Sequence, residues 1–146
     1  MKVLLQRVTN AAVEVESNTV GSIGQGLLLF VCLEEGDTSA KLKPIAEKVA
    51  NLRVFAEGEK HFHLSLLETG FAALVVSQFT LAADLSKGRR PDFFRALKPE
   101  LAKPLVAEFV TALRECGVKQ VEEGIFGAYM QVSLENDGPV TLWLEG

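Results

Sequence analysis

The sequence predicts one α+β domain, built on a curved, largely antiparallel β-sheet or barrel with two main flanking helices. About seven or eight short segments are apolar and rich in β-branched residues, whereas only two segments repeat apolar residues at helical spacing. The strand-like segments do not alternate regularly with the helical ones, as they would in a parallel α/β fold. A length of 146 residues with 48% hydrophobic residues suits a single domain, residues 1–146, with a core of its own.

The first part of the chain has the pattern of strands. Residues 2–15 are mostly apolar with partial alternation, which predicts a first strand. Residues 20–23 and 26–33 predict a second strand that is apolar on both faces and therefore central. The GSIGQG segment, residues 21–26, lacks the lysine and the full glycine spacing of a phosphate loop, so it indicates a β-bulge or hairpin turn.

The two helices are predicted from apolar residues that share one face. The first spans about residues 39–52, after N-cap candidates at 37–39. The second spans about residues 99–116 and ends at a glycine. The other predicted strands are residues 53–55, 62–66, 72–79, 118–123, 129–135 and 140–145, the last two joined by Asn136-Asp137-Gly138-Pro139.

Composition limits the classes of function. The net charge is −4, with 19 acidic and 15 basic residues, so any contact with RNA must come from a local patch. The longest apolar run, residues 26–33, is too short to span a bilayer, and the amino terminus lacks the features of a signal peptide. We therefore expect a soluble, cytoplasmic protein with no membrane partner. Cys32 and Cys116 have the pattern of small core residues, not of a disulfide or a metal site.

Two catalytic arrangements are considered and not favoured. His61 and His63 would share one face of a strand, as two metal ligands do, but no third ligand stands out and an exposed pair is favoured. We therefore predict no metal. A Ser/His/Asp triad with Ser77 or Thr80 as nucleophile is compatible with any chain order. However, the chain has no GxSxG motif and no carboxylate placed to orient either histidine.

A basic cluster occurs in this acidic chain, in KGRRPDFFRALK. It is either a solvated loop or, because it directly follows SQFTLAAD, a source of positive charge for a polyphosphate or an RNA backbone beside a site. Its basic residues are Lys87, Arg89, Arg90, Arg95 and Lys98, against Asp92 alone.

Two short polar motifs each leave two interpretations open. SQFTL, residues 77–81, ends an apolar run, so its polar groups belong either to a satisfied strand end or to the wall of a site. NDGPVT, residues 136–141, is either a simple turn between the last two strands or a Gly138-Pro139 bond held cis with its backbone facing a ligand.

Motifs from end to end of the chain resemble those of one family, the D-aminoacyl-tRNA deacylases, editing hydrolases that remove D-amino acids from mischarged tRNA. SQFTL and NDGPVT together are the specific part of the resemblance. The resemblance implies the fold of that family and no cofactor. The shared segments are MKVLLQRV, VGSIGQGLLLFV, AEKVANLRVF, VVSQFTLAAD, KGRRPDF, FGAYMQVSL and NDGPVT.

The resemblance implies a homodimer with shared active sites. The SQFTL residues of one subunit would line the aminoacyl ester, and Gly138-Pro139 of the other, as a cis peptide, would reach into the pocket. Main-chain carbonyls of that motif would hold the amino group and leave no room for the side chain of an L-residue, so only D-amino acids and glycine would be accepted. Arg7 matches the family arginine that orients the motif.

The resemblance also implies the chemistry. Backbone N–H groups near Gln78 and Phe79 would stabilise the oxyanion, while a water activated by the terminal 2′-hydroxyl of the tRNA attacks the ester. Thr80 as a nucleophile ranks second to a positioning role. Phe126 and Met130 match positions that accommodate the terminal adenosine. The predicted residues are Ser77, Gln78, Phe79 and Thr80 at the reacting ester, Gly138, Pro139 and Arg7 for chirality, and Phe126, Met130, Lys87, Arg89 and Arg90 for aminoacylated tRNA.

The chain departs from the family at three positions, which concern the adenosine pocket. Ala82 stands where tyrosine is usual, Tyr129 where a small acidic residue is common, and His63 near a usual asparagine.

Two other functions stay open: a non-catalytic nucleic-acid-binding module that uses the basic cluster, and a small-ester hydrolase that uses a serine or threonine.

Overall fold

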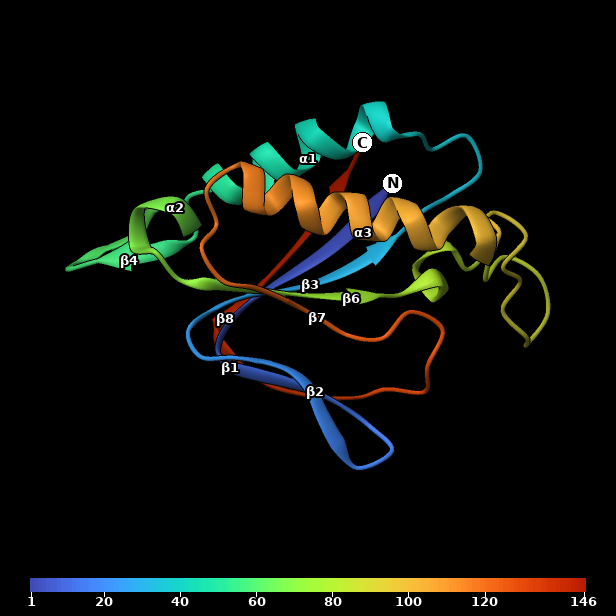
Figure 1. The fold of residues 1–146 in the computed structure, drawn as a ribbon, viewed down its shortest axis with the longest axis horizontal. Coiled ribbons are helices and arrows are strands. Elements are labelled where there is room, and N and C mark those ends of the chain that lie inside the picture. The colour runs from blue at the N-terminus through green and yellow to red at the C-terminus, as the bar shows by residue number, and fades with distance from the viewer.

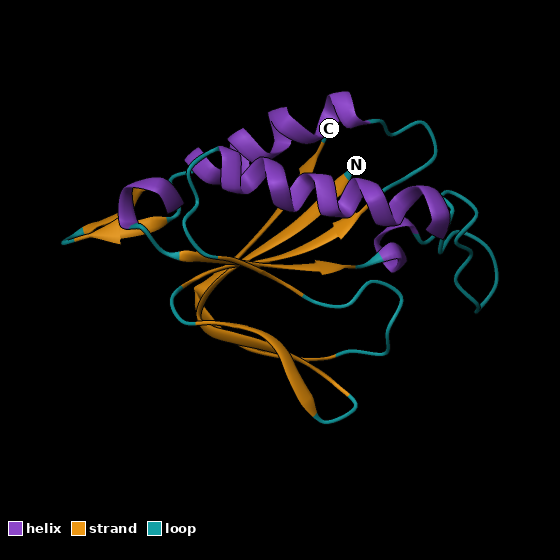
Figure 2. Cartoon of the chain, in the orientation of Figure 1, coloured by secondary structure: helices purple, strands orange, loops and turns teal.

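The computed structural model describes all residues, 1–146. The two long helices α1 and α3 pack side by side across one face of the sheet, and both chain ends lie on that side (Figure 1). Below the helices the sheet curls back on itself, so that it is nearly closed (Figure 2). The elements are β1 Lys2–Val15, β2 Asn18–Ile23, β3 Gly26–Cys32, α1 Ser39–Asn51, β4 Phe55–Glu57, β5 Lys60–Leu64, α2 Leu66–Thr69, β6 Ala72–Ser77, the 3₁₀ helix η1 Phe79–Ala82, α3 Pro99–Glu115, β7 Val121–Glu123 and β8 Gln131–Glu145.

Strand β1 organises the main sheet. Its edges pair with β8 on one side and with β2 and β3 on the other, all antiparallel, while β6 and β7 continue beyond β3 as parallel strands. Three of these five pairings are antiparallel, so the predicted α+β class with a largely antiparallel curved sheet is confirmed. The four-residue helix α2 adds a third helix to the two predicted ones.

The glycine-rich segment is a break in one edge of the sheet. β2 and β3 pair with β1 in one register, with Ala11 opposite Ile23 and Val8 opposite Gly26, and only two residues interrupt them. The segment is therefore neither the predicted bulge nor the predicted hairpin turn, because two residues of β1 face the two residues between β2 and β3 and the register does not shift there. Gly26 is required there because a Cβ would lie 1.9 Å from the backbone oxygen of Ala72.

The core has two parts, one on each face of the curved sheet. The larger cluster lies between the sheet and the helices and includes Val3, Leu5 and Phe109. The smaller cluster fills the inside of the curl and includes Val8 and Leu74. Because alternate residues of a strand face opposite sides, β1 and β6 contribute to both clusters and fix the position of everything at their ends.

Three predicted boundaries were wrong, one of them at the strand predicted over 118–123, which begins only at Val121. The predicted strand at 62–66 ends at Leu64, because Ser65 caps α2: its hydroxyl accepts from the Glu68 amide at 3.2 Å and the Glu68 carboxylate accepts from the Ser65 amide at 2.7 Å. The predicted strand at 53–55 begins only at Phe55.

The N-cap predicted at residues 37–39 is confirmed in position. Thr38 is the N-cap of α1, but its side chain makes no capping bond. The Asp37 carboxylate accepts instead from the Met1 ammonium at 2.7 Å, the Glu34 amide at 2.7 Å and Lys41 Nζ at 2.9 Å. Burial tends to raise the pKa of Asp37, but these hydrogen bonds outweigh burial, so the pKa lies below its usual value.

Of the two interpretations of residues 136–141, the simple turn between two strands was wrong, because β8 is one strand through this region. Gln6 pairs with Thr141 and Val8 with Asn136, so one residue of β1, Arg7, faces four residues of β8. The segment from Asp137 to Val140 is therefore a large bulge within a continuous strand. The Gly138-Pro139 peptide bond in it is cis.

No helix of the protein is both long and apolar enough to cross a bilayer.

Candidate active site

The SQFTL residues form a turn at the end of a central strand. β6 runs parallel to β3 and ends at Ser77, which pairs with Val31. The Gln78 amide then donates to the Val31 carbonyl at 2.8 Å, and the chain turns into η1. This geometry explains why polar residues follow a buried strand: the chain leaves the core at Ser77, and Phe79 and Thr80 are exposed.

A cavity of about 680 Å³ opens beside this turn. It lies between the ends of β3 and β6, the start of α3 and the segments 93–99 and 126–132, and 16 of its 22 lining residues are hydrophobic. Five predicted site residues line it: Ser77, Gln78, Phe79, Phe126 and Met130. A mostly apolar cavity with a few polar groups along one wall is the usual form of a small-ligand site.

Polar groups of the turn differ in their availability. The Gln78 N–H is committed to Val31, so it is not free to stabilise an oxyanion as predicted, whereas the first N–H groups of η1, beginning with Phe79, have no acceptor within that helix. Gln78 Nε2 donates to Thr80 Oγ1 at 2.6 Å. Thr80 itself does not line the cavity. Its hydroxyl therefore supports Gln78.

Two residues at this site were missed as site residues by the sequence analysis. Phe93 packs edge-on against Phe79, with ring centroids 5.0 Å apart, and covers one side of the turn. Cys32 lines the cavity, and its thiol donates to the Phe79 carbonyl at 3.6 Å. Burial, followed by the charge of Glu34, raises the pKa of Cys32 to about 11, so it stays a thiol at neutral pH. Cys32 lies beside the turn because β3 pairs with β6 in parallel, and the sequence alone does not show this pairing.

The Gly138-Pro139 bulge lies in another part of the protomer. Arg7 holds it: Nε donates to the Asp137 carbonyl at 3.1 Å and Nη1 to the Val54 carbonyl at 2.6 Å. Arg7 Nε also lies 3.1 Å from Asp137 Oδ2. Gly138 and Pro139 are exposed, and neither lines the cavity.

The strand register gives the separation of these two parts. Ser77 pairs with Val31 and Arg7 with Leu27, so their levels on β3 are four residues apart, or about 13 Å along the strand. The strands β1 and β3 lie between β8 and β6, which adds about 14 Å across the sheet. One protomer therefore does not bring Gly138-Pro139 to the SQFTL turn.

The basic residues occupy an exposed loop beside the amino end of α3 (Figure 1). The base of the loop is closed by two backbone hydrogen bonds between Asp84 and Asp92, of 2.7 and 3.1 Å. Lys87, Arg89 and Arg90 are exposed between these two residues and do not line the cavity. These three charges therefore lie outside the cavity, whereas Lys98 of the same basic cluster lines it.

The histidines lie on the hairpin of β4 and β5, which projects from the body of the protein (Figure 1). His63 Nε2 lies 3.2 Å from Glu57 Oε2, and His61 is exposed. No histidine lines the cavity. Of the two candidate nucleophiles, Ser77 therefore meets no histidine there and Thr80 accepts its hydrogen bond from Gln78, so the interpretation as a Ser/His/Asp triad has no support in this geometry.

Fold and cavity together define a single-domain α+β protein that presents a polar turn to an apolar ligand cavity. The family model for D-Tyr-tRNA(Tyr) deacylase matches residues 4–145. A D-aminoacyl-tRNA deacylase of Thermomicrobium roseum is 54% identical over 145 residues, which cover 99% of this chain and 94% of the relative. That of Dinoroseobacter shibae is 51% identical over 146 residues and 100% of both chains. The chain belongs to the D-aminoacyl-tRNA deacylase family.

Solved structures agree in fold. A c-Myc DNA unwinding element binding protein superposes with a TM-score of 0.94 at 40% identity, covering 100% of this chain and 99% of the other. A probable eukaryotic D-amino acid tRNA deacylase superposes with a TM-score of 0.87, covering 98% of this chain and 97% of the other. At 18% identity the second likeness concerns the fold alone.

Proposed function

We propose that this protein hydrolyses the ester bond between a D-amino acid, or glycine, and the end of a tRNA, in the cytoplasm where charged tRNA is found. The observation that carries the proposal is the SQFTL turn, which presents Ser77, Gln78 and Phe79 to a largely apolar cavity of about 680 Å³. That volume suits a nucleoside with an attached amino acid. Family membership supports the same reaction.

The terminal adenosine occupies the apolar part of the cavity. Phe126 and Met130 line it and offer an aromatic ring and a soft side chain for contact with a base. Tyr129, one of the departures from the family pattern, also lines the cavity and is 85% exposed, so it is free to adjust to the ligand. Ala82 is buried beneath the turn and His63 lies on the hairpin, so neither forms the cavity wall.

Hydrolysis depends on the substrate for its base. No histidine lines the cavity, and the Cys32 thiol is protonated, so the chain offers no conventional nucleophile with a base beside it. The terminal 2′-hydroxyl of the tRNA activates the water, and the Phe79 N–H stabilises the developing oxyanion. The protein mainly orients and polarises the ester.

Chirality is selected across a homodimer. Gly138-Pro139 lies about 13 Å along the sheet and about 14 Å across it from the SQFTL turn of its own chain. A second copy brings its exposed bulge, held by Arg7, to the turn of the first. The carbonyls of the bulge hold the amino group of the substrate and exclude an L-side chain. Glycine, without a side chain, is accepted.

The direct test is release of D-tyrosine, L-tyrosine and glycine from charged tRNA. We expect D-tyrosine and glycine to be released and L-tyrosyl-tRNA to persist. Equal rates for the two tyrosine enantiomers would refute the chirality mechanism. A tRNA that ends in 2′-deoxyadenosine should bind but turn over slowly, and unchanged turnover of that substrate would refute the role of the 2′-hydroxyl.

A second candidate is a non-catalytic nucleic-acid-binding module, which the name of the c-Myc DNA unwinding element binding protein brings into consideration. The exposed residues Lys87, Arg89 and Arg90 would supply the contact with the backbone. Tight binding of uncharged RNA or DNA without turnover of any charged tRNA would favour this candidate. Loss of binding in a Lys87→Ala/Arg89→Ala/Arg90→Ala variant, with hydrolysis of a minimal D-aminoacyl adenosine retained, would place the loop in tRNA recognition.

A further inference from the structure

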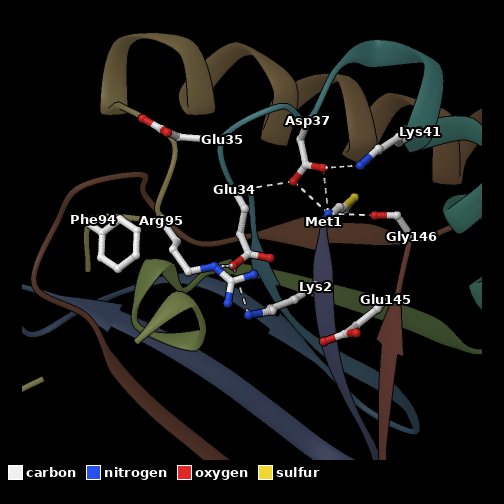
Figure 3. Close-up of a pocket in the computed structure, with 10 residues that line it drawn as sticks. All are labelled: Met1, Lys2, Glu34, Glu35, Asp37, Lys41, Phe94, Arg95, Glu145 and Gly146. Carbon is white, nitrogen blue, oxygen red and sulfur yellow. Dashed lines mark hydrogen bonds and ion pairs between the residues drawn. The ribbon is translucent and has the colours of Figure 1, made fainter. Parts of the chain in front are cut away.

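A second, polar cavity of about 610 Å³ adjoins the active-site cavity, and Glu35 and Phe94 line both. It is surrounded by charged side chains from both ends of the chain and from the loops after β3 and before α3 (Figure 3). Its lining residues are Met1, Lys2, Glu34, Glu35, Asp37, Lys41, Phe94, Arg95, Glu145 and Gly146.

Glu34 is the centre of an ion network in this cavity. Its Oε1 accepts from Lys2 Nζ at 3.0 Å and lies 3.4 Å from Arg95 Nε, and both basic side chains converge on it (Figure 3). The side chains of Lys2 and Glu34 are only 13% and 15% exposed. A pair this well shielded is held in one geometry far more firmly than a surface pair.

Lys2 also reaches the catalytic turn. Its Nζ donates a second hydrogen bond, of 3.3 Å, to the carbonyl of Leu81 in η1. That carbonyl is at the end of the 3₁₀ turn that begins at Phe79, where carbonyl groups lack partners within the helix and a cation is favourable. The charged ammonium of Lys2 therefore holds the carboxyl end of the turn, at Leu81, while the amino end of the same turn carries the N–H group of Phe79.

Arg95 connects Glu34 to the other side of the same turn. Its backbone carbonyl accepts from the Glu35 amide at 3.0 Å. Two residues before it, Phe93 packs edge-on against Phe79. The Glu34 carboxylate thus connects Lys2, which supports the turn, to the segment of Arg95 and Phe93, which covers the turn.

We propose that Lys2, oriented by Glu34, is a positioning residue for hydrolysis: it holds the Phe79–Ala82 turn in the geometry that stabilises the oxyanion. The inference rests on the proposed function of that turn. Lys2 touches neither the cavity of about 680 Å³ nor the reacting atoms. Its loss should therefore slow the chemical step without weakening tRNA binding.

The test is single-turnover hydrolysis of D-tyrosyl-tRNA over a range of enzyme concentrations, with three variants. Lys2→Met keeps a long unbranched side chain but removes both hydrogen bonds. It should lower the maximal rate on the order of tenfold to a hundredfold, while the enzyme concentration that gives half of the maximal rate stays unchanged. Lys2→Arg keeps a cation and should restore most of the rate. Lys41→Met removes a neighbouring lysine that binds Asp37 and does not touch the turn, and should leave the rate unchanged.

Each outcome decides the inference. Unchanged maximal rate in Lys2→Met, or an equal loss in Lys41→Met, would overturn it, because either result means that the network only stabilises the fold. If Lys2→Met does not fold, Glu34→Gln decides instead, since it removes the charge that orients Lys2: a lowered maximal rate supports the inference and an unchanged rate contradicts it. Wild-type protein without activity on D-tyrosyl-tRNA would refute the proposed function, a result separate from these.

Discussion

The SQFTL turn and the Gly138-Pro139 bulge are both irregular breaks at strands of one sheet, yet they are supported in different ways. The turn continues a buried central strand and forms the wall of a cavity made by its own chain. The bulge lies exposed in β8, opposite a single residue, and depends on hydrogen bonds from Arg7. One protomer therefore carries two separate parts, one concave and one projecting, which the proposed mechanism brings together between two copies.

Replacement of Gly138 should have the largest effect. Its φ is +126°, and a Cβ would lie 2.9 Å from Arg7 Nη2 and 3.0 Å from Val140 Cγ2, so Gly138→Ala must displace the bulge or the arginine. We expect a loss on the order of a hundredfold in D-tyrosyl-tRNA hydrolysis, because misplacement by about 1 Å is that costly. The matched control is Gly24→Ala, since a Cβ there has open space. Equal activity of the two variants would contradict a role for the bulge.

Replacement of Arg7 should have the second-largest effect on hydrolysis. Arg7→Ala leaves the carbonyls of Asp137 and Val54 without their donor, so the bulge loses its position while its own residues stay intact. We expect hydrolysis to fall about tenfold and the ratio of D- to L-tyrosine release to fall with it. Arg7→Lys should recover little, because lysine lacks the forked donors that reach two carbonyls. Arg53→Ala, which breaks an exposed pair with Glu68, should change neither quantity.

A smaller effect is expected on the concave side. Thr80 does not line the cavity and accepts one hydrogen bond from Gln78, so Thr80→Ala should reduce hydrolysis by no more than about tenfold. Complete loss of activity on D-tyrosyl-tRNA, with the fold intact by circular dichroism, would make Thr80 the nucleophile. That result would remove the contrast between a polarising turn and a selecting bulge.

The smallest effect on hydrolysis is expected at Asp37, whose replacement should instead change the free energy of unfolding. Because the folded-state pKa of Asp37 is lowered, its contribution is complete above the unfolded pKa of about 3.9 and is lost as pH falls through the folded value. Asp37→Asn should be less stable than wild type by about 3 kcal/mol at neutral pH. Urea unfolding from pH 7 to pH 2 should show this difference shrinking below about pH 4. A constant difference would contradict the ionic role.

The fold was largely predictable where long segments show one period. The helices at 39–52 and 99–116 and the strands at 2–15 and 72–79 were confirmed to within two residues at each end, because burial of one face or of both decides them. The errors fall where a single contact decides. Ser65 begins a short helix, and the bulge opposite Arg7 looks like a turn in sequence because both need glycine and proline.

The site was predictable only in part. The abrupt change from apolar to polar residues at Ser77 indicates a strand end, and the family resemblance assigns it a role. The commitment of the Gln78 N–H to Val31, the thiol of Cys32 beneath the turn and the link from Lys2 to Leu81 all depend on the pairing of strands distant in sequence. Residue spacing along the chain carries no information on these contacts.

The central claim, that each active site combines the turn of one protomer with the bulge of its partner, is tested most directly by complementation. Two variants are co-expressed with different tags and isolated as mixed dimers: Gln78→Ala/Phe79→Ala in one chain and Gly138→Ala in the other. In a two-fold dimer one site then receives both defects and the other receives none, so the mixed dimer should recover about half of the wild-type rate of D-tyrosyl-tRNA hydrolysis. A rate no higher than that of the two parent variants would contradict the account.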